Sequence, residues 1–113
     1  MITIYHNNRC SKSRQGLLLI EESGEDYVVK KYLEDVPTEA ELKVLINTLG
    51  IQPIDLIRKN ESIWKENFKG KALSKTEIIQ AMINYPKLIE RPIVVNGNKA
   101  VIGRPPEKIL EII

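Results

Sequence analysis

A strand, a helix and a second strand follow one another within the first 33 residues of the chain. Residues 2–6 ("ITIYH") and 27–33 ("YVVKKYL") are short and rich in β-branched and aromatic side chains, which is typical of strands. Between them, the segment from Ser11 to about Glu22 has a helical pattern that ends at Gly24. Strands connected through a helix in this way pair in parallel with a right-handed crossover. The N-terminal third is therefore expected to be α/β.

A run of predicted helices follows the second strand. Thr38 and Glu41 have the T-x-x-E spacing of a capping box, and Ser74 and Glu77 show the equivalent S-x-x-E spacing. Apolar side chains recur at helical intervals after each of these starts, and no glycine- or serine-rich linker interrupts the run. We therefore expect a helical insertion over about residues 37–89.

The C-terminal part returns to strands. Residues 92–95 ("PIVV") and 99–102 ("KAVI") flank the turn dipeptide Asn96-Gly97, which predicts a β-hairpin, and a short helix is expected to close the chain. The complete order fits a thioredoxin-like α/β fold, with a mixed four-stranded sheet and a helical insertion between its second and third strands. We expect a single domain over residues 1–113.

Composition limits the partners and the compartment. The 113 residues carry 17 basic and 15 acidic side chains, and this net charge of +2 indicates neither a nucleic-acid nor a membrane partner. The longest aliphatic run, "LLLI" at 17–20, is far shorter than the roughly 20 residues that span a bilayer. The N-terminus has no signal-peptide pattern, so a cytoplasmic location is expected. One cysteine and one histidine are too few for a zinc site, and we expect no bound metal or cofactor.

The only cysteine, Cys10, follows the first predicted strand and precedes the first predicted helix. A thiol at the N-terminal end of a helix has a lowered pKa, because unpaired backbone N–H groups and the helix dipole stabilise the thiolate. Arg9, Lys12 and Arg14 add positive charge nearby. A lone cysteine in a small protein is ordinarily an inert buried side chain. Here the polar neighbours on both sides do not form an apolar pocket, so the local sequence favours a reactive thiol.

Two further polar residues flank the cysteine. Ser13 and the N–H groups after Cys10 are placed to hydrogen-bond the sulfur, and His6 would add charge when protonated. A structural histidine that closes the first strand is an equally good interpretation of His6. The spacing "CSKS" is C-x-x-S rather than the C-x-x-C of dithiol oxidoreductases, and the chain has no second cysteine to resolve a mixed disulfide. A second thiol must therefore come from a partner.

Four segments, spread over nearly the whole chain, are distinctive in their order: "YHNNRCSKSR" (5–14), "LIRKN" (56–60), "LIERPIVV" (88–95) and "GRPPE" (103–107). They resemble the landmarks of the ArsC arsenate reductase family, of the glutaredoxin-coupled type. The resemblance implies a thioredoxin-like (glutaredoxin-like) fold with a helical insertion. It also implies a helix-capping cysteine that attacks arsenate, glutathione or an equivalent small thiol as co-substrate, and a glutaredoxin as partner.

The resemblance assigns roles to particular residues. Cys10 is identified as the nucleophile, His6 as the family's histidine that tunes it, and Ser13 as a serine that the family shares. The arginines that would bind the oxyanion are Arg58 in "LIRKN", Arg91 in "ERPIV" and Arg104 in "GRP". Planar guanidinium groups suit this task, because they match the oxygens of a tetrahedral oxyanion in bidentate fashion.

The same resemblance suggests a cis peptide bond before Pro92, because thioredoxin-like folds usually carry a cis-proline before the third strand. It also leaves two alternatives to an arsenate reductase. One is an Spx-like transcriptional regulator that binds RNA polymerase, although such regulators often carry a C-x-x-C switch that Ser13 removes here. The other is an ArsC-like thiol oxidoreductase with a different oxyanion substrate, because an anion-and-thiol site does not by itself identify arsenic.

Overall fold

The computed structural model describes residues 1–113, which form two compact units. The first, here called the sheet unit, consists of Met1–Asp35 and Arg91–Ile113. The second, the helical unit, is Val36–Glu90. The helical unit covers the stretch for which the sequence predicts a helical insertion. Whether the two units act as one domain stays a prediction.

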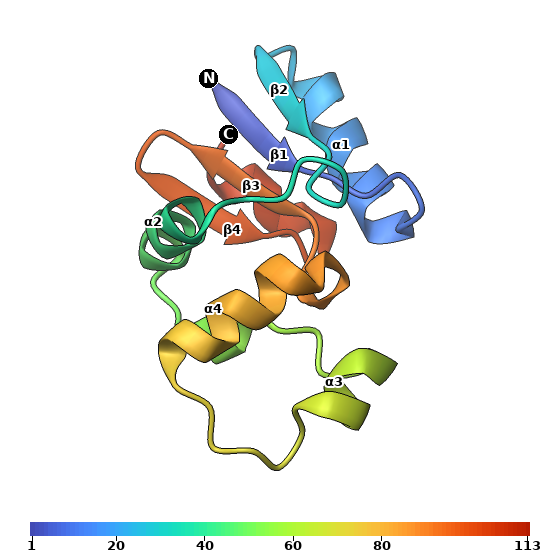
Figure 1. Cartoon of the computed structure of the whole chain (residues 1–113). Coiled ribbons are helices and arrows are strands. Elements are labelled where there is room, and N and C mark those ends of the chain that lie inside the picture. Colours follow the sequence, from blue (N-terminus) through green and yellow to red (C-terminus); the bar gives the residue numbers. More distant parts are fainter. The chain divides into compact units, whose positions relative to one another are not determined.

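The sheet unit contains a mixed sheet of four strands in the order β2-β1-β3-β4 (Figure 1). The strands are β1 (Ile2–Tyr5), β2 (Tyr27–Lys30), β3 (Ile93–Asn96) and β4 (Lys99–Ile102). β1 pairs with β2 in parallel and with β3 antiparallel, and β3 pairs antiparallel with β4. The predicted mixed α/β sheet is therefore confirmed, with the helical unit inserted between its second and third strands.

Several strand boundaries differ from the prediction, and the first and third strands do so by only one residue at an end. β2 ends at Lys30 instead of residue 33, because the N–H groups of Glu34 and Asp35 both donate to the Lys31 carbonyl and close a turn. In the hairpin, Asn96 is still paired with Lys99, so the two-residue loop is one position further along the chain than predicted. Its first residue, Gly97, has a φ of 62°, which favours glycine.

One face of the sheet is covered by α1 (Ser11–Ser23) and by the 3₁₀ helix η3 (Pro106–Glu111). The buried cluster on this face contains Ile2, Ile4 and Val94 from the strands, Ile20 from α1 and Ile109 from η3. The alternate positions Ile2 and Ile4 share a face because successive side chains of a strand point to opposite sides. This packing fixes the direction of α1, and so the position of its N-terminal end.

A glycine in α1 makes the contact with η3 close. A Cβ atom on Gly16 would lie 2.8 Å from Cδ1 of Ile109 and 3.0 Å from Cγ of Pro92. The absence of a side chain lets α1 approach this near without displacing the end of the Ile109 side chain. The close approach holds the start of α1 beside the segment that enters β3.

The helical unit is built from short helices that are capped as the sequence predicts. Its elements are α2 (Glu39–Leu49), the 3₁₀ helix η1 (Pro53–Leu56), α3 (Ser62–Asn67), α4 (Lys75–Asn84) and the 3₁₀ helix η2 (Pro86–Leu88). Both capping boxes are present, Thr38 with Glu41 and Ser74 with Glu77. After Gln52 the chain forms only one short 3₁₀ segment, which begins at Pro53.

A short antiparallel bridge between Ile57 and Ile89 ties η1 to η2. The N–H of Arg58 donates to the Leu88 carbonyl (2.7 Å), and the N–H of Glu90 donates to the Leu56 carbonyl (2.9 Å). Arg58 and Glu90 are thus held on neighbouring backbone segments.

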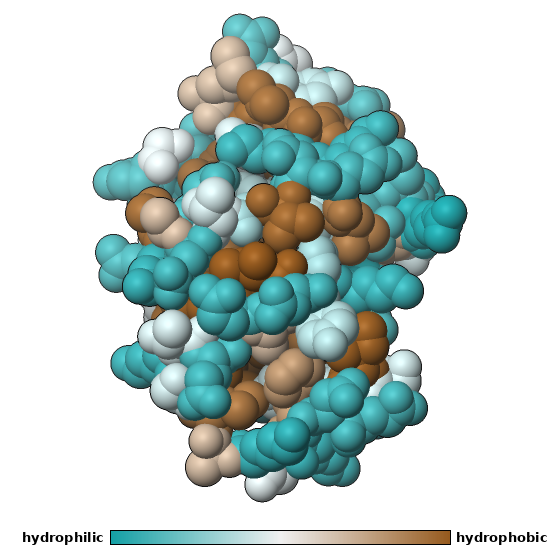
Figure 2. Space-filling model, in the orientation of Figure 1, coloured by the Kyte–Doolittle hydropathy of each residue, from teal (hydrophilic) through white to brown (hydrophobic).

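Figure 2 shows mainly hydrophilic side chains on the visible surface, with smaller hydrophobic groups among them. None of the helices has the length and the apolar character needed to cross a membrane.

Candidate functional site

Cys10 lies where the chain passes from β1 into α1, immediately before the first helical residue. Its backbone is extended (φ −95°, ψ 121°), and its carbonyl accepts the N–H of Arg14 at 3.0 Å. Its own N–H donates to the Asn7 carbonyl, also at 3.0 Å, which closes the turn. The thiol is free and partly exposed. It therefore lies at the helix start that the sequence predicts.

The surroundings lower the pKa of the Cys10 thiol below its ordinary value. Burial by itself would raise this pKa, but several groups together outweigh it by stabilising the thiolate: the backbone N–H of Ser13, the guanidinium of Arg91 and the backbone N–H of Lys12. Arg91 acts both by hydrogen bonding and by its charge. The thiolate is therefore favoured by a helix N-terminus and by an arginine that is distant in sequence.

The charge that acts on the sulfur differs from the one expected from the local sequence. The cation is Arg91, which enters from the segment before β3, rather than Arg9, Lys12 or Arg14. Arg14 is engaged elsewhere, because its Nη1 donates to the Asn8 carbonyl at 2.9 Å. Lys12 contributes through its backbone rather than its ammonium group.

His6 and Ser13 are both buried and are joined directly, with 2.6 Å between Nδ1 of His6 and Oγ of Ser13. The Ser13 hydroxyl also accepts the N–H of Asn7 at 3.0 Å, so its own proton is available for Nδ1. Burial, and the positive charges of Lys31 and Arg14, lower the pKa of His6 despite the opposing effect of Asn8. These surroundings favour the neutral imidazole over the positive charge that a protonated His6 would add. The contact with Ser13 links the end of β1 to the first turn of α1, on either side of the thiol.

Arg104 lies next to Arg91 in the sheet unit. Its Nη1 donates to the backbone carbonyl of Arg91 at 3.0 Å. The peptide bond between Arg91 and Pro92 is cis, which confirms the prediction, and the bond between Arg104 and Pro105 is also cis, which the sequence did not suggest. Two of the three predicted oxyanion-binding arginines are thus brought together, one acting on the thiol and the other on the backbone of the first.

Arg58 belongs to the helical unit and is paired with two carboxylates there. Its Nη1 lies 3.1 Å from Oε1 of Glu61, and its Nε lies 3.7 Å from Oε1 of Glu90. The side chains of all three residues are mostly buried, with Arg58 19% exposed. The predicted convergence of Arg58 with Cys10 stays a prediction. Sequence reasoning missed both carboxylates, although the i, i+3 spacing of Arg58 and Glu61 is a recognisable signal for an ion pair.

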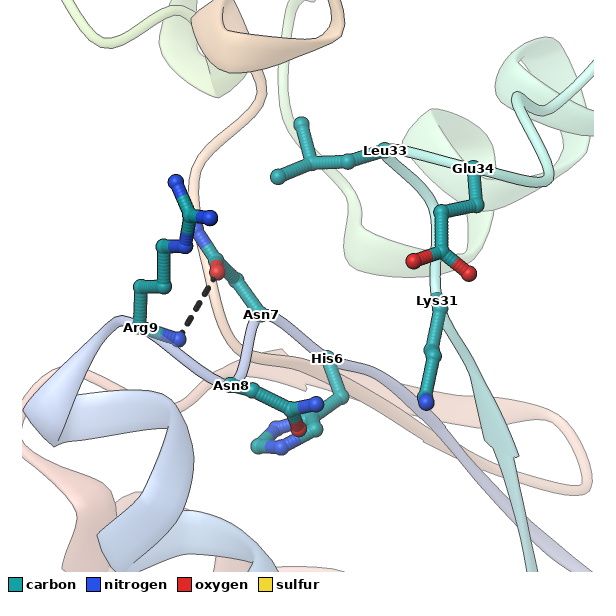
Figure 3. A pocket seen from close by; sticks show the side chains of 7 residues that line it. All are labelled: His6, Asn7, Asn8, Arg9, Lys31, Leu33 and Glu34. Carbon is teal, nitrogen blue, oxygen red and sulfur yellow. Dashed lines mark hydrogen bonds between the residues drawn. The ribbon is translucent and has the colours of Figure 1, made fainter.

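A cavity of about 380 Å³ opens beside the loop that leads to Cys10. Figure 3 shows Asn7, Asn8 and Arg9 on one side of it and Lys31, Leu33 and Glu34 on the other. The two sides follow β1 and β2, whose carboxyl ends lie at the same edge of the sheet because the strands are parallel. The lining thus combines two cations, Arg9 and Lys31, with one carboxylate, Glu34.

Tyr32, between two residues of this lining, was also missed by sequence reasoning. Its side chain is only 1% exposed, and its hydroxyl makes no hydrogen bond of ordinary geometry. The available signal was its position near the end of the strand predicted over residues 27–33, which is expected to lie parallel to the strand before Cys10. Residues after parallel neighbouring strands emerge at one edge of the sheet.

Comparisons with known proteins agree with this geometry. The sequence model of the ArsC family matches residues 5–112. The uncharacterized protein YfgD of Escherichia coli (strain K12) is 48% identical, over 99% of this chain and 96% of the relative. An arsenate reductase of Haemophilus influenzae is 41% identical, over 99% of this chain and 98% of the relative. The solved structure of an arsenate reductase from Vibrio cholerae has a TM-score of 0.94 at 46% identity, covering 99% of this chain and 97% of that one.

These matches extend over both units and all four strands of the sheet, and so over more than the thiol loop alone. The helical insertion, the helix-capping cysteine and the cis-proline before β3 all lie within the matched region. The chain therefore belongs to the ArsC family and has the thioredoxin-like α/β fold of that family.

Proposed function

We propose that the protein is an arsenate reductase that converts arsenate to arsenite through a covalent bond between the Cys10 sulfur and arsenic. One observation carries the proposal: a thiol of lowered pKa lies at the start of α1 beside the guanidinium of Arg91. This pairs a nucleophile with a cation suited to an oxyanion. Relatives of similar length named arsenate reductase support the choice of arsenate.

The first step joins sulfur to arsenic. The thiolate of Cys10 supplies the electron pair of the new S–As bond, and one As–O bond breaks as that oxygen takes up protons and leaves as water. Arsenic remains As(V) in this adduct. Arg91 stabilises the thiolate before the attack and the charge on the arsenate oxygens during it. The N-terminal N–H groups of α1 act in the same direction.

The other predicted site residues take supporting roles. Arg104 holds the backbone of Arg91 and, with Arg58, offers further guanidinium N–H groups to the oxyanion. To do so, the Arg58 guanidinium must release the carboxylates of Glu61 and Glu90 and bind the oxyanion in their place. Ser13 and His6 act by positioning, because their mutual hydrogen bond fixes the turn before the thiol.

The second sulfur comes from a small thiol, because Cys10 is the only cysteine in the chain. We assign this part to glutathione or an equivalent thiol, which forms a second S–As bond while another oxygen leaves as water. The cavity beside the thiol loop supports this choice, because about 380 Å³ can accommodate a small peptide. Its cations Arg9 and Lys31 suit the two carboxylates of glutathione, and Glu34 suits its ammonium group.

Reduction follows when a glutaredoxin thiolate attacks the glutathione sulfur. The S–As bond breaks and its electron pair stays on arsenic, which becomes As(III), while glutaredoxin and glutathione leave as a mixed disulfide. Hydrolysis of the remaining S–As bond releases arsenite and restores the Cys10 thiol. The two electrons therefore come from the two external thiols.

The test measures arsenite formed from arsenate by the purified protein. The first mixture contains thioredoxin, thioredoxin reductase and NADPH, and the second contains glutathione, glutaredoxin, glutathione reductase and NADPH. We expect multiple turnovers only in the second mixture. Lys31→Gln should raise the KM for glutathione while leaving the KM for arsenate unchanged, and Lys108→Gln, on η3, is the matched control.

Two results would contradict the proposal in different ways. Sustained turnover in the thioredoxin mixture would show that no small thiol is needed. We do not expect it, because a chain with one cysteine cannot form the internal disulfide that thioredoxin reduces. Absence of arsenite in every mixture, while arsenate or phosphate still shields Cys10 from alkylation, would point to a different oxyanion substrate.

A further inference from the structure

Tyr32 is placed inside the fold by the turn that follows β2. Its neighbours Lys31 and Leu33 are exposed and line the cavity of Figure 3, whereas Tyr32 is 1% exposed. The side chain therefore points into the protein from the edge of the sheet that also carries the thiol loop. An aromatic ring buried at such an edge has an ordinary packing role, but its hydroxyl needs a separate explanation.

The hydroxyl of Tyr32 is buried and makes no hydrogen bond of ordinary geometry, although the side chains of Asn7 and Arg91 lie near it. A buried hydroxyl without a partner destabilises a fold, so such groups are rare unless a water, an ion or a ligand completes them. Burial raises the pKa of Tyr32 to about 12, although Arg91 and Asn7 are near enough to oppose this rise. At neutral pH the group is therefore a protonated O–H donor.

The topology explains why this hydroxyl lies near the thiol. Tyr5 at the end of β1 pairs with Lys30 at the end of β2 and with Ile93 at the start of β3. The segments that carry Cys10 and Tyr32 therefore leave the sheet at the same edge at which the segment with Arg91 enters it. The charges of Cys10 and Arg91 both act on the Tyr32 phenol, which agrees with this placement.

We propose that Tyr32 is a further oxyanion-binding residue, whose hydroxyl donates a hydrogen bond to an oxygen of the anion held by Cys10 and Arg91. The identity of the anion as arsenate rests on the proposed function, whereas the hydrogen bond to a tetrahedral oxyanion does not. Such an anion offers several acceptor oxygens. A neutral donor among cations adds direction without further charge repulsion between protein groups.

The test uses Tyr32→Phe, which removes only the hydroxyl, in the full-length protein. Cys10 is alkylated with neutral iodoacetamide at pH 7 in the presence of increasing arsenate or, separately, phosphate, which cannot be reduced by thiols. We expect the variant to need about tenfold more of either anion for half-protection, the size of one hydrogen bond to a charged group. Tyr27→Phe is the matched control, because the Tyr27 hydroxyl is 3.4 Å from Glu21 in an exposed contact on β2.

Two further measurements, the unfolding temperature and the Cys10 pKa, distinguish an oxyanion contact from a purely structural role of the hydroxyl. Without anion, Tyr32→Phe should unfold at a temperature no lower than the wild type, because no hydrogen bond is lost. The pH dependence of alkylation should also show an unchanged Cys10 pKa. A lower unfolding temperature would mean that the hydroxyl is already bonded in the free protein. A raised Cys10 pKa would mean that it serves the thiolate, and either result would overturn the proposal.

The outcomes also separate this inference from the proposed function. If the wild type forms arsenite and Tyr32→Phe needs no more anion for protection, the role of Tyr32 is wrong and the reductase stands. If no arsenite forms but phosphate protection weakens about tenfold in Tyr32→Phe, the oxyanion contact stands and arsenate reduction is wrong. If no anion protects the wild type, the contact is wrong, and the arsenite assay alone decides the function.

Discussion

Arg91 in the sheet unit and Arg58 in the helical unit stand in opposite electrostatic surroundings. The guanidinium of Arg91 acts on the Cys10 thiolate, whereas that of Arg58 faces Glu61 and Glu90. The sheet unit thus directs a positive charge to its nucleophile without any ligand. The helical unit instead neutralises its candidate cation within its own fold.

This difference implies different tasks for two arginines that the family resemblance treats alike. In the proposed mechanism, Arg91 prepares the nucleophile and is needed before arsenate arrives. Arg58 can contribute only when an oxyanion competes with its two carboxylates. Changes in the sheet unit should therefore affect the reactivity of Cys10 itself, and changes in the helical unit should affect only the response to the anion.

The largest effect is expected from Cys10→Ser. A serine hydroxyl is a far weaker nucleophile than a thiolate at neutral pH, so arsenite formation should fall to the uncatalysed rate. Arsenite is measured in the complete glutathione and glutaredoxin mixture, and far-UV circular dichroism shows whether the variant is folded. Any catalysed turnover by this variant would place the chemistry outside the sheet-unit thiol.

A smaller but still large effect is expected from Arg91→Lys. Lysine keeps the charge but cannot reproduce the planar fork, so kcat/KM for arsenate should fall by roughly 30- to 1,000-fold, as when about 2–4 kcal/mol of transition-state stabilisation is lost. The pKa of Cys10 should rise, as measured by the pH dependence of iodoacetamide alkylation. Arg14→Lys is the control for that pKa, because Arg14 interacts with Asn8 instead. An unchanged Cys10 pKa in Arg91→Lys and Arg91→Ala would remove the contrast with Arg58.

An intermediate effect of opposite sign is expected from Glu61→Gln. This change removes the nearer carboxylate from Arg58 and leaves the guanidinium more available to the anion, so the KM for arsenate should fall by about threefold. The Cys10 pKa should not move. Glu66→Gln, on the same helix α3, is the matched control. If Arg58→Ala leaves the KM for arsenate unchanged, Arg58 has no role in binding the oxyanion.

The fold was largely predictable because its signals are local. The capping boxes at Thr38 and Ser74 and the strand–helix–strand order each depend on residues a few positions apart. The errors lie at element ends, where tertiary hydrogen bonds decide. The turn that closes on the Lys31 carbonyl ends β2 early, and the pairing of Asn96 with Lys99 shifts the hairpin loop.

The site was predictable only in part, because its electrostatics depend on distant residues. The helix start at Cys10 could be read from the local sequence, but the cation that acts on it comes from residue 91 rather than from its neighbours. The neutral state of His6 depends on burial, which a sequence does not display. The partners of Arg58 and the buried hydroxyl of Tyr32 likewise require the chain to be folded.

A small effect of pH on the free energy of unfolding is expected from Cys10, in the sheet unit. The pKa of Cys10 is lowered in the folded chain, so between the folded and unfolded pKa values the unfolded chain binds more protons and the free energy of unfolding rises with pH. This contribution is complete above the unfolded pKa of about 8.5 and is lost as the pH falls through the folded value. Urea unfolding of the wild type and Cys10→Ser between pH 5 and 9 should show a difference in slope. Parallel curves would contradict a lowered Cys10 pKa.

The smallest effect is expected from the helical unit, at acid pH. The capping box lowers the pKa of Glu77, chiefly through the backbone N–H of Ser74 and then through its side chain. The stabilisation is present above the ordinary glutamate pKa of about 4.3 and is lost as the pH falls through the folded value. Glu77→Gln keeps an acceptor for the Ser74 N–H but cannot titrate, so its unfolding midpoint should lose part of the acid dependence seen in the wild type. Glu66→Gln should retain that dependence. If Glu77→Gln instead flattens the alkaline slope assigned to Cys10, the two pH windows do not belong to separate units.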